Sequence, residues 1–200
     1  MPSSPQPVAE ILAALQRALS ALGVRWFLFG AQAAILYGVA RLSADVDVTV
    51  DPGRRSASEL AAALAAAGFE SRVPDVARFA ETTRVLPLVH AVSGMPLDVV
   101  LSGPGLEEQF FAGVREHVIG DARVPVVCPE DLVAMKVLAG RPRDLDDVAA
   151  IVRVGRDYLD LDRVRSTLRL LEGALDRGDL VSELERAVAA VRPPPPQPLA

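Results

Sequence analysis

The spacing of hydrophobic positions changes along the chain and predicts helices at both ends with strands between them. Apolar residues recur every three or four positions from residue 8 to residue 22, which predicts an amphipathic helix that ends at Gly23. Short, mostly apolar runs follow, and such runs are typical of buried strands. These runs predict strands at residues 24–29, 45–51, 69–73, 84–90, 95–101, 114–119 and 122–128.

Capping residues and glycines predict the remaining elements. Ser56 and Glu59 form a capping box that opens an alanine-rich helix, and Gly68 ends it. Residues 74–82 show no clear period and are expected to be irregular. Further helices are predicted at residues 31–37, 106–112 and 129–139, from about residue 144, and at 161–175 and 179–191. The pattern is that of an α+β protein with a helical C-terminal third.

The composition narrows the class of protein. The chain has 200 residues, of which 50% are hydrophobic and 24% charged, as expected of a globular protein with a sizeable core. The formal net charge of −5 argues against broad, non-specific nucleic-acid binding, which depends on Lys and Arg contacts to phosphate, but it allows one basic patch. The single cysteine, Cys128, excludes an intrachain disulfide and fits a cytoplasmic location. Neither a signal peptide nor a membrane span is predicted.

Two aspartates, Asp45 and Asp47, lie two residues apart in a valine-rich run. Because side chains alternate along a strand, the valines are expected on one face and both carboxylates on the other. A divalent cation, Mg²⁺ or Mn²⁺, commonly binds such a pair. The alternative is an exposed edge strand with an acidic outer face. Asp51 shares this face but borders a turn, and we interpret it as a turn residue.

Fifteen residues before Asp45, Gly30 separates a predicted buried strand from a short helix. A strand–glycine–helix turn can direct backbone N–H groups at an anion, and glycine has no Cβ to obstruct a phosphate. An ordinary tight turn is the alternative for Gly30 alone. A more specific pattern is the combination of this turn and helix with Arg41, Ser43 and the D-x-D motif formed by Asp45 and Asp47.

Two stretches of the sequence resemble one family. The run from Gly30 to Val48, G-A-Q-A-A-I-L-Y-G-V-A-R-L-S-A-D-V-D-V, resembles the opening motif of the nucleotidyltransferase superfamily. It is most similar to the branch that contains the AbiEii-type toxins of toxin–antitoxin and abortive-infection systems. The stretch from Pro129 to Val148 is similar to the lysine-bearing helix and R-D-x-x-D motif of that branch.

The resemblance covers residues 24 to 150, approximately, and implies a nucleotidyltransferase fold of the polymerase-β type, a mixed sheet flanked by helices. We expect a catalytic core at residues 1–150, a C-terminal helical extension at 151–191 and a proline-rich tail at 192–200.

The reaction implied by the resemblance is transfer of a nucleotide from an NTP to an acceptor, with release of pyrophosphate. Asp45 and Asp47 would hold Mg²⁺ or Mn²⁺ together with a third carboxylate. Asp98, a lone acid in an apolar strand, is the candidate for that third group and for deprotonating the acceptor hydroxyl. The alternative is that Asp98 is an outward-facing, solvated aspartate.

Further site residues are expected in the second stretch. Lys136 is predicted to contact the triphosphate as a point charge, or else to extend past its apolar neighbours to solvent. The resemblance places Asp144 in the active site, whereas Asp144 and Asp147 are alternatively the N-cap and first-turn residues of a helix. Nucleotide contacts are expected from Lys136 together with Gly30, Ala31, Arg41, Ser43 and Arg141.

The resemblance, together with a local run of arginines, predicts an RNA acceptor, namely a tRNA end. Arginines 141, 143, 153 and 156 follow Lys136 closely in an otherwise acidic chain, although they alternatively offset nearby acids. The resemblance further implies a toxin with NTP and RNA as substrates and a cognate antitoxin as partner. One alternative is an antitoxin-like transferase that modifies a partner protein. Another is a catalytically silent nucleotide-binding module, because Ala31 stands where the superfamily often has serine or glycine.

Overall fold

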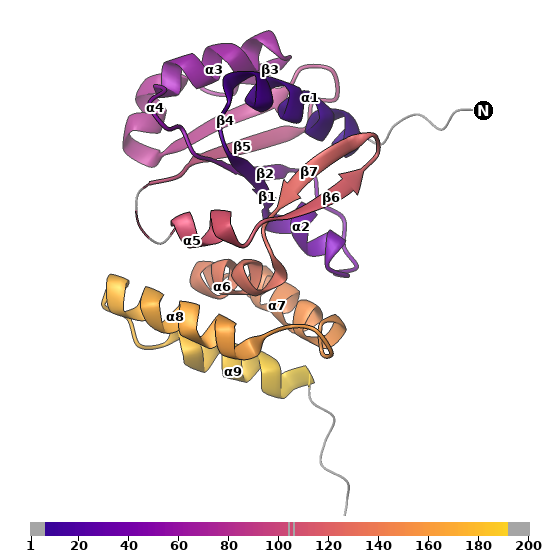
Figure 1. Cartoon of the computed structure of the whole chain (residues 1–200), viewed down its shortest axis with the longest axis vertical. Helices are drawn as coiled ribbons and strands as arrows, with labels where there is room; N and C mark the ends of the chain where they lie inside the picture. The colour runs from indigo at the N-terminus through magenta and orange to yellow at the C-terminus, as the bar shows by residue number, and fades with distance from the viewer. Residues whose placement is uncertain (1–6, 104, 106, 192–200) are drawn as a thin grey trace, which may run out of the picture. The chain divides into compact units, whose positions relative to one another are not determined.

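The computed structural model describes residues 7–103, 105 and 107–191 (Figure 1). The predicted proline-rich tail at 192–200 lies outside them. The chain forms two compact units. The first contains the described residues up to Ala33 together with Arg41–Cys128, and the second contains Ala34–Ala40 together with the described residues from Pro129 onward.

A mixed sheet forms the centre of the first unit. Within the described residues it has seven strands in the order β3-β4-β5-β2-β1-β7-β6. β2 pairs in parallel with β5 and antiparallel with β1, so the strand that carries Asp47 is central and the edge-strand interpretation is wrong. The strands are β1 (Trp26–Phe29), β2 (Val46–Val50), β3 (Phe69–Ser71), β4 (Val85–His90), β5 (Pro96–Leu101), β6 (Arg115–Ile119) and β7 (Ala122–Val126).

Helices pack on this sheet, and α2 runs from the first unit into the second. The predicted capping box is present, because the Ser56 hydroxyl accepts from the backbone N–H of Glu59 and the Glu59 carboxylate accepts from that of Ser56. The helices that begin in this unit are α1 (Pro7–Leu22), α2 (Gly30–Leu36), α3 (Ala57–Ala66), α4 (Val76–Thr83) and α5 (Glu107–Ala112).

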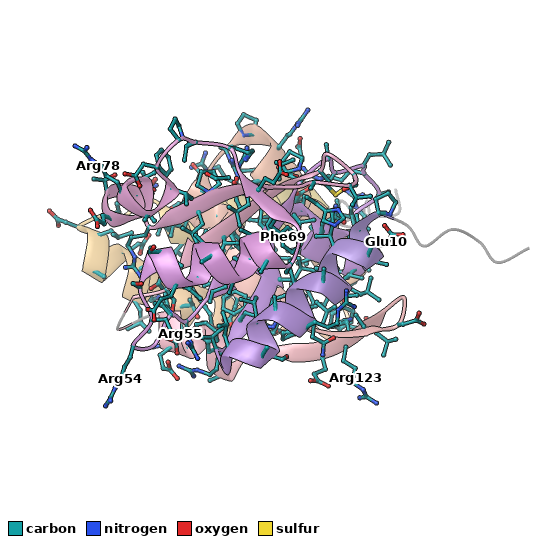
Figure 2. The ribbon with its side chains drawn as sticks, turned by 90° about the horizontal axis from the view of Figure 1, so that it is seen from above. Glu10, Arg54, Arg55, Phe69, Arg78 and Arg123 are labelled. Carbon is teal, nitrogen blue, oxygen red and sulfur yellow. The ribbon has the colours of Figure 1, made fainter. Side chains whose placement is uncertain are left out.

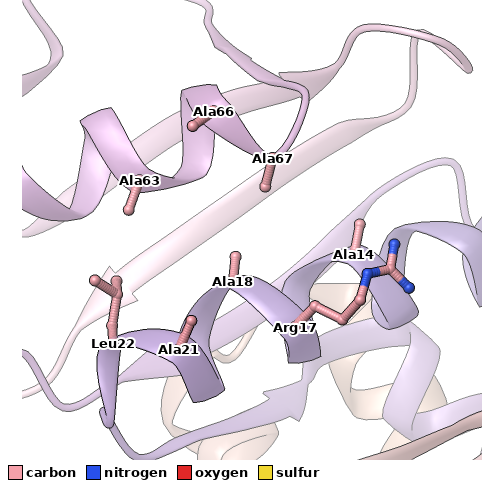
Figure 3. Close-up of a pocket in the computed structure, with 8 residues that line it drawn as sticks. All are labelled: Ala14, Arg17, Ala18, Ala21, Leu22, Ala63, Ala66 and Ala67. Carbon is pink, nitrogen blue, oxygen red and sulfur yellow. The ribbon is translucent and has the colours of Figure 1, made fainter.

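Small side chains line the space between α1 and α3. The two helices lie side by side over the sheet in Figure 2, where Arg54 and Arg123 point outward. Figure 3 shows the alanines of α3 facing those of α1 across a shallow hollow of about 410 Å³. The hollow is lined by Ala14, Arg17, Ala18, Ala21, Leu22, Ala63, Ala66 and Ala67.

The expectation that residues 74–82 are irregular is wrong, because α4 occupies most of this range. Asp75 caps the helix by accepting a hydrogen bond from the backbone N–H of Arg78 at 3.0 Å. Only Ala80 is buried in the helix, so the sequence lacks the repeated apolar positions by which a helix is normally predicted.

β3 ends at Ser71, two residues earlier than predicted, and Pro87 explains the end. The backbone N–H of Arg72 donates to the carbonyl of Pro87 at 2.9 Å. Proline has no N–H with which to return the second hydrogen bond of this pair. The ladder between β3 and β4 therefore ends at this point.

The described part of the second unit consists mainly of the helices that follow Cys128 in the chain (Figure 1). α6 packs against α7 and α8, and α7 packs against α9. α6 and α7 thus share one hydrophobic core with α8 and α9, and for this reason the second unit begins at Pro129 and not at the boundary of 150 expected from the sequence. None of the described helices is long and apolar enough to cross a membrane. The four helices are α6 (Pro129–Ala139), α7 (Pro142–Val154), α8 (Leu161–Leu175) and α9 (Leu180–Val191).

Candidate active site

Strand register aligns a row of residues around Asp47 in the first unit. Phe29 of β1 pairs with Asp47 of β2, Asp47 pairs with Asp98 of β5, and Asp98 pairs with Pro87 of β4. Residues that pair directly across neighbouring strands point to the same face of a sheet. The structure therefore brings Asp47 and Asp98 side by side on one face.

The burial of β2 follows the predicted alternation in part. Val46, Val48 and Val50 are fully buried and Asp47 is half-buried. Thr49, on the same face as Asp47, is 3% exposed, so this face becomes covered toward the end of the strand. The accessible end of β2 is consequently the one that carries Asp47.

Gly30 lies directly against Asp47. Its φ of +68° is in the left-handed region, and a Cβ built on it would lie 2.0 Å from Oδ2 and 2.7 Å from Cγ of Asp47. A side chain at position 30 is thus opposed both by the backbone conformation and by the Asp47 carboxylate. The sequence pattern indicated that glycine makes room for a phosphate, and in the structure the group that needs this space is Asp47.

Asp45 precedes β2 and is exposed. Its carboxylate accepts a hydrogen bond from the Ser43 hydroxyl at 2.5 Å, so these two predicted site residues do come together. The buried amide of Gln32 donates to the Asp45 carbonyl at 3.2 Å and ties α2 to the D-x-D segment. The sequence analysis missed Gln32, although a lone amide within the apolar run A-Q-A-A-I-L was a signal for it.

Asp98 forms an ion pair with Arg72, which follows β3. Both side chains are partly exposed, at 37% for Arg72 and 40% for Asp98. Arg72 was not predicted as a site residue, because nothing in its local sequence pattern distinguishes it from other surface arginines.

The carboxylates of the first unit fit a divalent cation. Among the described residues, no group of three or more His, Cys, Asp and Glu side chains is arranged to hold a metal ion. Mg²⁺, however, usually binds one or two carboxylates and completes its coordination with water and substrate phosphates. The paired Asp47 and Asp98 fit this requirement, with Asp45 two residues from Asp47.

Lys136 in the second unit is buried, and the expectation that its side chain reaches solvent is wrong. It is 4% exposed, and its Nζ donates to Asp147 Oδ2 at 2.7 Å and to Asp144 Oδ1 at 3.2 Å. It is also the only lysine in a sequence that otherwise uses arginine. This was an overlooked signal, because lysine and arginine are not interchangeable.

Asp144 and Asp147 do not cap α7. Arg141 occupies the N-cap position, and both aspartates lie within the helix and are buried. Arg141 Nε donates to Asp144 Oδ2 at 2.5 Å. Burial raises the pKa of Asp144, but the Arg141 hydrogen bond and the Lys136 charge outweigh it and hold this pKa below its ordinary value. Asp147, which the sequence analysis did not include in the site, contacts Lys136 at the shorter distance.

The predicted basic patch is not uniform. Lys136 is buried, Arg141 pairs with Asp144, and Arg156 donates to the carbonyl of Val191 at 3.4 Å. Arg143 and Arg153 are exposed and make no hydrogen bond or ion pair with the part of the chain that the structure describes. A phosphate can bind either of these two without competing with a partner among the described residues.

Comparison with solved structures places the sheet and its helices among nucleotidyltransferases. An antigenic nucleotidyltransferase-like protein from Paracoccidioides brasiliensis is 19% identical over 89% of this chain and 92% of its own, with a TM-score of 0.54. A lincomycin-bound lincosamide antibiotic adenylyltransferase, LnuA, is 13% identical over 76% of this chain and 99% of its own, with a TM-score of 0.51. At these identities the likeness concerns the fold, and it confirms the predicted α+β nucleotidyltransferase architecture.

Comparison by sequence identifies the family. The family described as "Nucleotidyl transferase AbiEii toxin, Type IV TA system" matches residues 13–196, which is most of the chain. No curated protein matches. The resemblance seen in the two sequence motifs is thereby confirmed, and the chain belongs to the AbiEii family of nucleotidyltransferase toxins.

Proposed function

We propose that this nucleotidyltransferase transfers a nucleotide from an NTP to RNA, at a tRNA end, in a reaction that depends on Mg²⁺ or Mn²⁺. The observation that carries the proposal is the register pairing of Asp47 with Asp98 beside the Gly30 turn. Two carboxylates on one face of a central strand pair are costly unless a cation offsets their repulsion. The family description further favours a toxin with a cognate antitoxin as partner.

Asp47 and Asp98 would hold the cation, with Asp45 at the edge of the site. A bound cation stabilises the negative charge that develops on the phosphates. Asp98 is partly exposed, as a group that accepts a proton from an acceptor hydroxyl must be. Backbone N–H groups at Gly30 and Ala31, with Arg41 and Ser43, are proposed to bind the nucleotide.

The nucleotide-binding roles of Lys136 and Arg141 and the catalytic role of Asp144 stay predictions. The structure adds a condition to the Lys136 role, because two of its three N–H donors are directed at Asp144 and Asp147, which leaves one for a triphosphate. Arg141 is 76% exposed and needs no rearrangement to reach an anion.

Labelling tests the proposal directly. The purified chain is incubated with each α-labelled NTP and Mg²⁺ in the presence of RNA or protein extracts. We expect label on RNA with the wild type and none with Asp47→Asn. Asp51→Asn is the matched control. Asp51 follows the same strand, but its carboxylate pairs with Arg25 and accepts a hydrogen bond from the backbone N–H of Gly53 in the turn. The Asp51→Asn variant should therefore retain activity.

The other outcomes discriminate between the alternatives. Label on protein alone, with RNA unlabelled for all four NTPs, would replace this proposal with the antitoxin-like transferase. Absence of label in every fraction would favour a silent nucleotide-binding module. Expression in a bacterial host should slow growth, and Asp45→Ala should relieve the effect.

A further inference from the structure

Arg72 extends the row of paired residues that contains the two aspartates. Its backbone N–H bonds the carbonyl of Pro87, which pairs with Asp98, which in turn pairs with Asp47. Two strand spacings, roughly 9–10 Å, separate the backbones of Arg72 and Asp98. Pro87 lies between them and has no polar side-chain atom. The long Arg72 side chain therefore passes over the proline and meets the Asp98 carboxylate.

We infer that Arg72 is a positioning residue that competes with the divalent cation for the Asp98 carboxylate. The inference rests on the proposed function, since it takes Asp98 as a ligand of that cation. The Arg72 guanidinium has the same sign of charge as the cation and forms an ion pair with the Asp98 carboxylate. It also offsets the repulsion between Asp98 and Asp47 while no divalent cation is bound.

The exposure of the pair sets the size of the effect. Ion pairs between partly exposed side chains are weak, so the cation needs to overcome only a modest competitor. Removal of the guanidinium should tighten cation binding by about two- to fivefold. In the wild type, Arg72 thus raises the concentration of divalent cation at which the proposed metal site is half occupied.

Equilibrium Mn²⁺ binding to the purified full chain, followed by the electron paramagnetic resonance of free Mn²⁺, measures this competition without any turnover. Arg72→Ala and Arg72→Gln should both bind Mn²⁺ about two- to fivefold more tightly than the wild type. Arg78→Ala is the matched control and should bind as the wild type does. It removes the same charge from the same unit, and the Arg78 side chain points outward and makes no hydrogen bond or ion pair with the described residues (Figure 2).

An Asp98→Asn background distinguishes competition at Asp98 from a general charge effect. There Arg72→Ala should no longer change Mn²⁺ affinity. An equal change in Mn²⁺ affinity in Arg72→Ala and Arg78→Ala would overturn the inference. An effect of Arg72→Ala that persists in the Asp98→Asn background would overturn it as well. In both cases the proposed metal site itself would stand. Failure of the wild type to bind Mn²⁺ would overturn the proposed metal site and this inference with it.

Discussion

Single residues among those predicted for the site have narrow steric and electrostatic limits. Gly30 combines a left-handed backbone with the close approach of Asp47, and Lys136 is a buried cation between two buried carboxylates. In both places one substitution changes several interactions at once. A matched control is therefore needed to separate the effect on the site from a general loss of stability.

Gly30→Ala should lower the rate of nucleotide transfer by about 10²-fold, because the new Cβ displaces the Asp47 carboxylate. A shift of a catalytic group by about 1 Å has an effect of this size. Gly23→Ala is the control. Gly23 has nearly the same φ, +66°, and a Cβ there would meet nothing within 4 Å. It should therefore show the backbone strain but keep its activity. Equal losses in initial rate in the two variants would contradict a role for the contact with Asp47.

Lys136→Met should destabilise the protein by about 3–5 kcal/mol, because it removes the cation that the buried Asp144 and Asp147 share. A lysine that reached solvent could instead be replaced with little effect on the fold. Adding Asp144→Asn and Asp147→Asn to Lys136→Met should restore much of the stability. Urea unfolding measures both effects, and an unchanged midpoint for Lys136→Met would show that the cluster contributes nothing to folding.

Among the elements, those with regular apolar spacing were predicted well and the weakly patterned ones were not. α6 begins and ends at the predicted residues, whereas α4, with one buried residue, was missed. The connection between α6 and α7 depends on polar contacts, since Lys136 and Arg141 both bind Asp144 at the start of α7. The stability of this connection should therefore depend on pH.

Arg141→Ala should lower the free energy of unfolding by up to about 1 kcal/mol at pH 7, because it removes an ion pair with one exposed partner. The pKa of Asp144 is lower in the folded state than its ordinary 3.8. The contribution of ionised Asp144 to the free energy of unfolding is thus complete above pH 3.8, and it is lost as the pH falls through the folded-state pKa. The difference between wild type and Arg141→Ala should shrink over this range.

Arg143→Ala is the control for this pH dependence, because Arg143 is exposed and has no partner among the described residues. Arg143→Ala should leave the free energy of unfolding unchanged at pH 7 and near pH 3. Denaturant titrations at pH 7 and near pH 3 provide the measurement. A difference for Arg141→Ala that persists at the lower pH would assign the effect to packing of its side chain.

At the scale of the whole molecule, a net charge of −5 disfavours non-specific RNA binding and concentrates attention on local groups of arginines. Of the arginines predicted to follow an RNA backbone, the structure leaves Arg143 and Arg153 exposed and without partners in the described chain. A phosphate contact by either should appear in the salt dependence of RNA binding.

Arg143→Ala should weaken RNA binding at moderate salt and reduce the slope of log K against log salt by about one unit, with NTP binding unchanged. Arg169→Ala, which removes an exposed arginine of α8 outside the predicted patch, is the control. Fluorescence anisotropy with labelled tRNA over a salt series gives both slopes. Identical slopes for the two variants would remove Arg143 from the RNA interface.

The sequence by itself determined the local parts of the candidate site. Alternation placed the valines of β2 in the core and Asp47 away from them, and Gly30 marked the turn from β1 to α2. These features depend on neighbours within a few residues, where strand period, turn chemistry and capping are the controlling interactions. The two motifs also carried the family resemblance.

Only the tertiary structure decided which charged groups meet. Arg72 and Asp98 lie 26 positions apart in sequence and come together through the order and register of β3, β4 and β5. Lys136 meets Asp144 and Asp147 because α7 packs against α6. Hydrophobic periodicity indicates which face of a helix or strand is buried, but it does not indicate which other element packs against that face. The partner of each charged side chain depends on which elements pack together.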